Sequence, residues 1–285
     1  MAEGKVLTGA GLRGQVAGKT ALSTVGKSGA GMQRSMRGWK NPSLSTTSFK
    51  HEVVGNNQVV TVEYTVGITA QQNNRQRMRP DQQQQPQQPQ AQPQQPKLIM
   101  TYTITPDGTV IVDEEMKVGE DGNKFPQLLR YGMELEMPQE FSNIEFYGKG
   151  PRENYIDRNN FALIGVYKQK VADQYWGYVR PQESGNKTQV RYWKVLNASN
   201  KGLEFFSNEP MECSSLPYLT DDLDPSENKA QHHSGDLIER PLTSVHIAQR
   251  QMGMGCVNSW GAWPRQEYQM PCKDRKFTFV IKPVK

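Results

Sequence analysis

Strict alternation of apolar and polar residues on both sides of a glutamine-rich tract is the feature that most limits how this chain can fold. Before the tract, residues 59–68 read VVTVEYTVGI, and after it residues 98–104 read LIMTYTI. A period of two is typical of β-strands with one buried face. The tract itself, residues 71–97, holds 13 Gln and five Pro, so it cannot build a core and is predicted to be disordered. The sequence therefore predicts a hairpin whose loop is the tract.

The same alternation recurs along the chain between turn signals. After the turn Pro106-Asp107-Gly108, apolar residues at positions 110, 112, 116 and 118 share one face. Further strands are predicted from the segments GMELEM, VRYWKVL, GLEFFS, SVHIAQ and KFTFVIKP. One short helix is predicted near Leu219–Asn228, with Thr220 as its cap. This number of strands predicts an all-β fold, a sandwich of two large antiparallel sheets.

The net charge of +5 is carried by two segments that look unstructured. Residues 1–40 have a balance of +6 and residues 71–97 a balance of +3, so the rest of the chain carries −4. A nucleic-acid-binding domain would instead concentrate its basic residues on a folded face. The sequence therefore predicts no nucleic-acid partner.

Other classes of protein are excluded by what the sequence lacks. No stretch approaches the ~18–20 continuous apolar residues of a membrane-spanning helix, so no membrane partner is expected. No apolar secretory segment is visible at the N-terminus, so the compartment is unknown, and both a cytoplasmic and a periplasmic location of the full-length protein stay open. The three cysteines form no CxxC pair, so neither a disulfide framework nor a zinc site follows. His232 and His233 have no third ligand beside them, so no metal or other cofactor is expected.

Three segments carry patterns that are more specific than strand periodicity. Residues 146–158 read FYGKGPRENYIDR, residues 178–193 read YVRPQESGNKTQVRYW, and residues 251–261 read QMGMGCVNSWG. In this order and spacing they resemble the C-terminal domain of the β-galactosidases of glycoside hydrolase family two, which some bacteria encode as a separate small chain. The resemblance covers about residues 29–285, and residues 1–28 are predicted to be a disordered or foreign leader.

The resemblance implies a fold and a division of labour. The fold is a large antiparallel β-sandwich, a supersandwich of the galactose mutarotase-like type. Family members place their two catalytic glutamates on an upstream (β/α)8 barrel, and retaining glycosidases need these carboxyls ~5–5.5 Å apart. Nothing in this sequence resembles that barrel, so the chain is expected to have no catalytic residue and to be inactive alone.

The expected function is therefore that of a C-terminal domain or small subunit of a β-galactosidase. Its expected partners are the galactoside substrate and the catalytic barrel domain or large subunit. The alternative is a free-standing carbohydrate-binding or mutarotase-like protein. A mutarotase needs a histidine and a glutamate on one concave sheet face, and His246 is the only histidine in the predicted strands, which weighs against that alternative.

Trp260 is the residue expected to bind substrate. The resemblance implies that the tryptophan of the S-W-G motif offers its face to the sugar, and a rigid indole suits the C–H face of a pyranose. Ser259 and Asn258 are expected to support it, although many relatives have two aspartates where this chain has Val257 and Asn258. Trp263 is expected to support the loop or to pack at a domain interface. The competing interpretation is that Trp260 packs under its own loop.

The polar residues of the other two motifs are interpreted as structural. Glu153, Asp157 and Arg158 look like an acid/base cluster, but a turn network in which carboxylates accept from backbone N–H groups and pair with arginine explains them better. The polar residues of the segment RPQESGN, residues 180–186, receive the same interpretation. His246 is interpreted as a structural histidine within a strand.

Overall fold

The part of the chain that the structure describes folds into one antiparallel sheet of 12 strands. The structure is a computed structural model, and it describes residues 13–15, 37–39, 42–68, 93–179, 181–223, 233–255 and 263–285. The strands are β1 (Arg13–Gln15), β2 (Ser43–Val54), β3 (Asn57–Gly67), β4 (Lys97–Ile104), β5 (Val110–Lys117), β6 (Arg130–Pro138), β7 (Asn143–Gly150), β8 (Leu163–Lys170), β9 (Lys187–Leu196), β10 (Gly202–Leu216), β11 (Leu242–Gln251) and β12 (Arg275–Val284).

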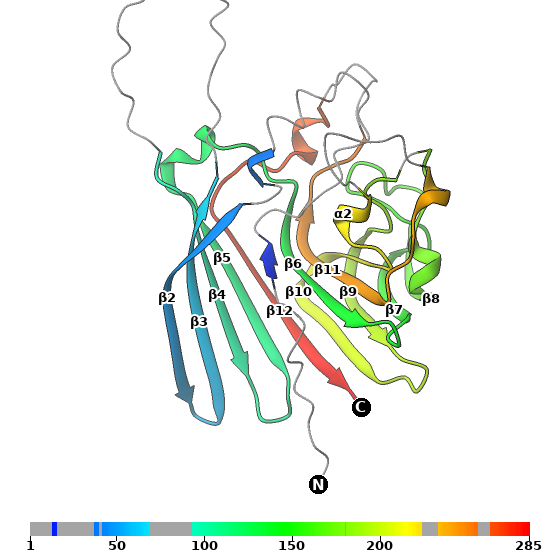
Figure 1. Cartoon of the computed structure of the whole chain (residues 1–285), viewed down its shortest axis with the longest axis horizontal. Coiled ribbons are helices and arrows are strands. Elements are labelled where there is room, and N and C mark those ends of the chain that lie inside the picture. Colours follow the sequence, from blue (N-terminus) through cyan, green and yellow to red (C-terminus); the bar gives the residue numbers. More distant parts are fainter. Residues whose placement is uncertain are drawn as a thin grey trace, which may run out of the picture.

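Strand β10 is the point where the sheet divides into two limbs. Its first part, Gly202–Phe206, pairs with β12, and the chain of neighbours continues through β5, β4 and β3 to β2. Its last part, Glu212–Leu216, pairs with β11, which continues to β6 and β1. On its other edge, β10 pairs with β9, followed by β7 and β8. Figure 1 shows the β2–β5 limb on one side and the strands β6 to β11 on the other.

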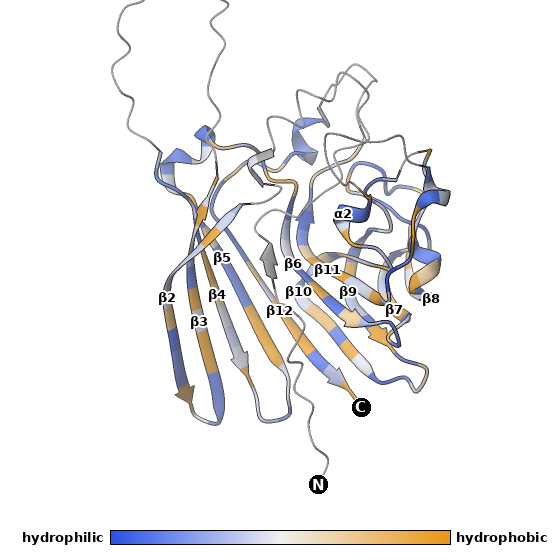
Figure 2. Cartoon of the chain, in the orientation of Figure 1, coloured by the Kyte–Doolittle hydropathy of each residue, from blue (hydrophilic) through white to orange (hydrophobic). Residues whose placement is uncertain are grey.

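Both limbs bury side chains in the same hydrophobic core. The alternation predicted from the sequence is visible as bands of apolar colour along the strands in Figure 2. Core residues of the two limbs include Val112, Met116 and Phe279 on one and Met133, Leu135, Val245 and Ile247 on the other. The all-β antiparallel prediction is confirmed. The two layers are nevertheless limbs of one hydrogen-bonded sheet and not two separate sheets, because β10 is shared between them.

The hairpin predicted around the glutamine tract is present. Strands β3 and β4 pair antiparallel, from Thr65 opposite Lys97 to Gln58 opposite Ile104. Residues 69–92 lie outside the described residues, so the disorder of the tract stays a prediction there. Its last residues belong to the fold, because the Gln95 side chain accepts a hydrogen bond from the backbone of Ile68 at 2.9 Å.

Four strands escaped the sequence prediction: β1, β2, β7 and β8. Strand β7 alternates in burial, but two of its buried positions are Gly148 and Gly150, so its apolar pattern is short. All twelve residues of β2 are exposed, so its sequence SLSTTSFKHEVV shows no alternation of burial. Strand β8, at another edge, is likewise exposed along most of its length, and it pairs with β7. Within the predicted leader, Arg13–Gln15 form β1, which pairs with β6.

Helical structure is short throughout the described residues. The predicted helix is present as α2 (Thr220–Leu223), with Thr220 as its first residue and residues 224–232 outside the described part. Short 3-10 helices occupy Arg37–Trp39, Gly119–Lys124, Val171–Gln174, Ser234–Asp236 and Gln266–Tyr268. No described helix is long and apolar enough to cross a membrane.

Candidate functional site

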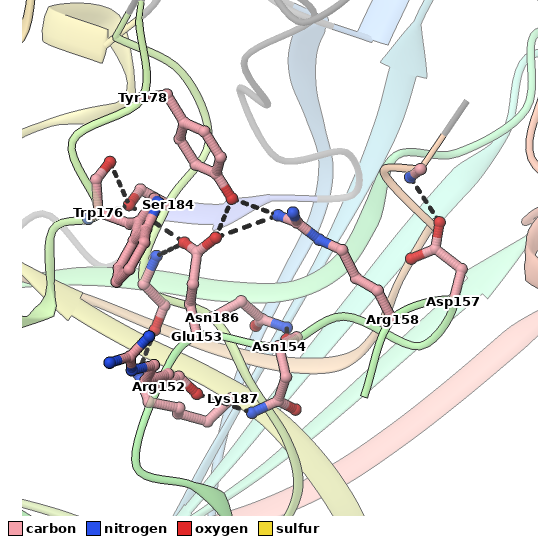
Figure 3. Close-up of polar contacts among 12 residues, drawn as sticks. Arg152, Glu153, Asn154, Asp157, Arg158, Trp176, Tyr178, Ser184, Asn186 and Lys187 are labelled. Carbon is pink, nitrogen blue, oxygen red and sulfur yellow. Dashed lines mark hydrogen bonds and ion pairs between the residues drawn. The ribbon is translucent and has the colours of Figure 1, made fainter. Parts of the chain in front are cut away.

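The three motif segments, which lie far apart in the sequence, meet at one place in the fold. The first contains the end of β7 and the loop that follows it, the second leads into β9, and the third begins at the last residue of β11. Figure 3 shows side chains of the first two segments pointing toward one another. We call this group the motif cluster, defined as Glu153, Asn154, Asp157, Arg158, Tyr178, Glu183, Ser184, Asn186 and Gln251.

Glu153 is the centre of the cluster and is bound on both of its oxygens. Its Oε2 accepts hydrogen bonds from the backbone N–H of Gly185 at 2.8 Å and from Ser184 Oγ at 3.2 Å. Its Oε1 accepts from the Tyr178 hydroxyl and lies 3.0 Å from Arg158 Nη2. Burial, and then the neighbouring carboxylate, raises the pKa of the Tyr178 phenol, so this hydroxyl remains a donor. Glu153 thus holds two loops together, as the turn-network interpretation expects.

A pair of buried asparagines joins the same loops to the sheet. Asn154 Oδ1 accepts from the backbone N–H of Thr188 at 3.0 Å, at the start of β9. Asn186 Nδ2 donates to the backbone oxygen of Asn154 at 3.0 Å and to Glu212 Oε2, on β10, at 3.1 Å. Because buried amides need partners for both donors and acceptors, these bonds fix the two loops in one arrangement.

Asp157 binds the third motif. Its Oδ2 accepts a hydrogen bond of 2.5 Å from the backbone N–H of Gly255. A Cβ atom at Gly253 or at Gly255 would lie 2.8 Å from the Asp157 carboxyl, so the glycines of QMGMG allow the close approach. The chain continues from Gly255 into residues 256–262, which lie outside the described part.

Three of the four predicted site residues therefore have no described position. Trp260, Ser259 and Asn258 all fall within residues 256–262, so their role stays a prediction. Trp263 is described: it is partly buried and packs against the hydrophobic core. Its expected role, support of the loop or packing at a domain interface, stays a prediction.

Arg130, which was not predicted from the sequence as a site residue, links the second and third motif segments. It is the first residue of β6, and its guanidinium is buried. Its Nη2 donates to Glu183 Oε2 at 2.8 Å, and its Nε donates to Gln251 Oε1 at 2.9 Å. A single arginine in the apolar run LLRYGM was the signal that could have pointed to this buried ion pair.

Arg130 also fixes the tautomer of His246. Its Nη1 lies 2.6 Å from His246 Nδ1. A guanidinium can only donate, so Nδ1 accepts, and the ring hydrogen lies on Nε2, which is 3.3 Å from Glu134 Oε1. His246 is thus a fixed part of a buried polar layer, in agreement with its structural interpretation.

Two further ionisable groups are buried next to the motif cluster. Burial raises the pKa of the Glu212 carboxyl to about 7, although the amide of Asn186 opposes this shift. Burial lowers the pKa of the Lys187 ammonium to about 8, and its Nζ donates to Gln174 Oε1 at 2.9 Å and to the backbone oxygen of Gly185 at 3.0 Å. Both groups serve to satisfy buried neighbours.

The described carboxylates of the motif cluster hold backbone and arginine groups. Glu153 and Asp157 accept from backbone N–H groups, and Glu183 pairs with Arg130. Within the described residues, no group of three His, Cys, Asp or Glu side chains could hold a metal ion. The cluster thus fixes the backbone after the end of β11, next to residues 256–262.

Sequence comparisons support a common origin with one family of enzymes. A family model described as "Beta galactosidase small chain" matches residues 28–281. A curated β-galactosidase from Halalkalibacterium halodurans is 37% identical over 185 residues, which are 64% of this chain and 18% of the relative. Those from Priestia megaterium and Lactobacillus delbrueckii subsp. bulgaricus are 32% and 31% identical, over 65% and 66% of this chain and 17% and 18% of their own length. The chain thus spans less than a fifth of these relatives.

A galactose mutarotase-related enzyme from Lactobacillus acidophilus is among the similar solved structures. It aligns over 84% of this chain and 72% of its own with a TM-score of 0.36 and 5% sequence identity. A similarity this low adds nothing to the functional argument.

Proposed function

Because this chain belongs to the β-galactosidase small-chain family, we propose that it is the small chain, or the corresponding domain, of a β-galactosidase. The complete enzyme hydrolyses terminal β-D-galactosides. The observation that carries the proposal is the family match over residues 28–281, together with the meeting of all three motifs in one cluster. The family match also favours this function over a free-standing carbohydrate-binding or mutarotase-like protein.

In this proposal, the chemistry and the scaffold reside on different parts of the enzyme. The catalytic carboxylates lie on a barrel domain or large subunit of the glycoside hydrolase family two type, which is the partner of this chain. The carboxylates of Glu153, Asp157 and Glu183 hold backbone and arginine and are not available for proton transfer. The proposed enzyme takes a galactoside as substrate and needs from this chain no cofactor, membrane or nucleic acid.

The contribution of this chain to the substrate site is Trp260. Its indole stacks on the C–H face of the sugar, and Ser259 and Asn258 support it. The hydrogen bond from the Gly255 N–H to Asp157 supports this role, because it fixes the backbone immediately before residues 256–262. Trp263 packs on the core directly after residues 256–262 and fixes the chain at that end.

Complementation tests the division of labour. The purified 285-residue chain is expected to show no turnover of a chromogenic β-galactoside, because it lacks the catalytic pair. The Halalkalibacterium halodurans enzyme is expected to be inactive without the segment that this chain matches, and active again when residues 28–281 replace that segment. Turnover by the purified chain that disappears when one of its own carboxylates is replaced would overturn the proposal.

The same chimera tests Trp260. Trp260→Ala is expected to raise KM by about fivefold to about 150-fold, because stacking on an aromatic side chain contributes ~1–3 kcal/mol by analogy with stacked bases. Trp260→Phe keeps a stacking face and should raise KM less. Thermal unfolding of both variants is the control. A large loss of stability in Trp260→Ala with an unchanged KM would make Trp260 a core residue.

A further inference from the structure

Strand β2 leaves a long sheet edge without a partner among the described strands. It ends the order of strands and pairs only with β3. Four apolar residues on it are exposed, and the two most exposed are Phe49 at 67% and Val53 at 64%. They lie in register with Val62 and Gln58 of β3, on the sheet face that continues from the core.

The hairpin turn decides which backbone groups point outward. Val54 and Asn57 pair across the two-residue turn Gly55-Asn56, and Gly55 has a φ of +61°, as a type II′ turn requires. The residues that flank such a turn form a hydrogen-bonded pair, and bonded pairs alternate along an antiparallel ladder. Alternate residues of β2, namely Phe49, His51 and Val53, therefore direct their N–H and C=O groups to the outer edge.

The edge has little of the usual protection against pairing. Natural edge strands are blunted by proline, by bulges or by charged side chains, especially lysine. Strand β2 has no proline, and its irregularity lies between Thr46 and Ser48, which leaves residues 48–54 regular. Its charges are Lys50 and Glu52, two residues apart on the opposite face from Phe49, with 2.7 Å between Nζ and Oε2.

We propose that this edge pairs with β2 of a second copy of the chain, antiparallel and centred on His51. In this register, Lys50 lies opposite Glu52 of the second copy, and Phe49 lies opposite Val53 of the second copy. Both pairs occur twice, so the strand is complementary to itself in charge and in apolar surface.

The same register also satisfies the backbone. Phe49, His51 and Val53 are the residues whose N–H and C=O groups point outward, and they oppose Val53, His51 and Phe49 of the second copy. Three bonded pairs supply about six backbone hydrogen bonds. The two-fold axis stands perpendicular to the sheet, so the core-side faces of both copies lie on the same side. The contact is one strand wide, so the dimer is weak and depends on concentration.

Charge reversal gives a test that is specific to this register. Sedimentation equilibrium of the full chain, with a reducing agent present, is expected to show a concentration-dependent dimer. Lys50→Glu alone and Glu52→Lys alone each place like charges opposite one another twice, and each should weaken association about tenfold. Mixing the two variants restores both opposite-charge pairs, so the mixture should form a heterodimer as tight as the wild-type dimer. A misfolded variant could not show this rescue.

A backbone variant tests the hydrogen bonds independently. His51→Pro removes an N–H that points outward and not toward β3, so the fold should survive and the dimer should be lost. A wild-type chain that stays monomeric up to about 1 mM would overturn the proposal. So would a dimer that neither His51→Pro nor the charge reversals weaken, because its contact would lie elsewhere. If the edge paired only with a strand of another protein, the wild-type chain would be monomeric, and the proposal would be overturned.

Discussion

Replacing Arg130 by methionine is expected to cost the chain about 3–5 kcal/mol of folding free energy. The guanidinium is the only described cation paired with Glu183, and both side chains are almost fully buried. Removing it leaves the Glu183 carboxylate buried without its counter-ion. It also removes the donors to Gln251 Oε1 and His246 Nδ1, which lie in the same buried layer. Urea unfolding at pH 7 measures the loss.

A second variant separates the ion pair from simple loss of packing. In Arg130→Met/Glu183→Met, both charges are gone, so the part of the lost stability that comes from the unpaired Glu183 carboxylate should return, because an apolar pair of similar volume is close to neutral relative to a buried ion pair. The part that comes from the lost donors to Gln251 Oε1 and His246 Nδ1 should remain. Arg158→Met is the matched control: it removes an arginine from a carboxylate of the same cluster, but the Arg158 side chain is 41% exposed. Its cost should be about 1 kcal/mol or less.

Two results would contradict this account of Arg130. One is a cost for Arg130→Met as small as that of Arg158→Met. The other is a double variant that is less stable than either single variant, since that would show that the two charges do not depend on each other.

Most strands could be predicted where apolar residues alternate, and they were missed where apolar alternation is absent or, as in β7, where glycines occupy two of the four buried positions. The segments that became β3, β4, β6 and β11 each present one apolar face to the core, so period two was visible. Strand β2 is exposed on both faces and is held by its pairing with β3. Such a strand is specified by its neighbour and its turn, and local hydrophobicity carries little trace of it.

The site was foreseen in its parts but not in its connections. The motifs identified the loops, and the interpretation of Glu153 and Asp157 as backbone-binding carboxylates agrees with their hydrogen bonds. The sequence could not indicate that Arg130 reaches two of the motif segments, because residues 130, 183 and 251 meet only through the pairing of β6 with β11 and the fold of the loop before β9. The lone arginine in an apolar run could indicate that Arg130 is buried and paired, but its partners have no local signature.

Glu114 is a second buried ionisable residue that the strand pattern did not reveal. On β5, apolar residues at positions 110, 112 and 116 mark the core face, and position 114 belongs to the same face. Its neighbours in register are Met100 of β4 and Phe277 of β12, and its side chain is 1% exposed. Among the described residues, its Oε1 has no hydrogen-bond partner. Burial raises the pKa of this carboxyl to about 8, so it is mostly protonated in the folded chain at neutral pH.

Stability is therefore expected to fall as pH rises from about 4.5 to about 8 and to level off above that range. The unfolded glutamate loses its proton near the ordinary value of 4.5, whereas the folded one keeps it up to about 8, so unfolding releases a proton throughout this interval. Glu114→Gln mimics the neutral acid and should remove this part of the slope. At pH 8 it should be more stable than the wild type by on the order of 2–4 kcal/mol, and at pH 4.5 nearly equal to it.

Glu115→Gln, on the opposite face of the same strand and partly exposed, is the control and should leave the slope in place. Part of the slope up to about pH 7 remains in every variant, because burial also raises the pKa of Glu212. Urea unfolding of the three proteins at several pH values measures the difference, and equal slopes for the wild type and Glu114→Gln would show that Glu114 is ionised inside the fold.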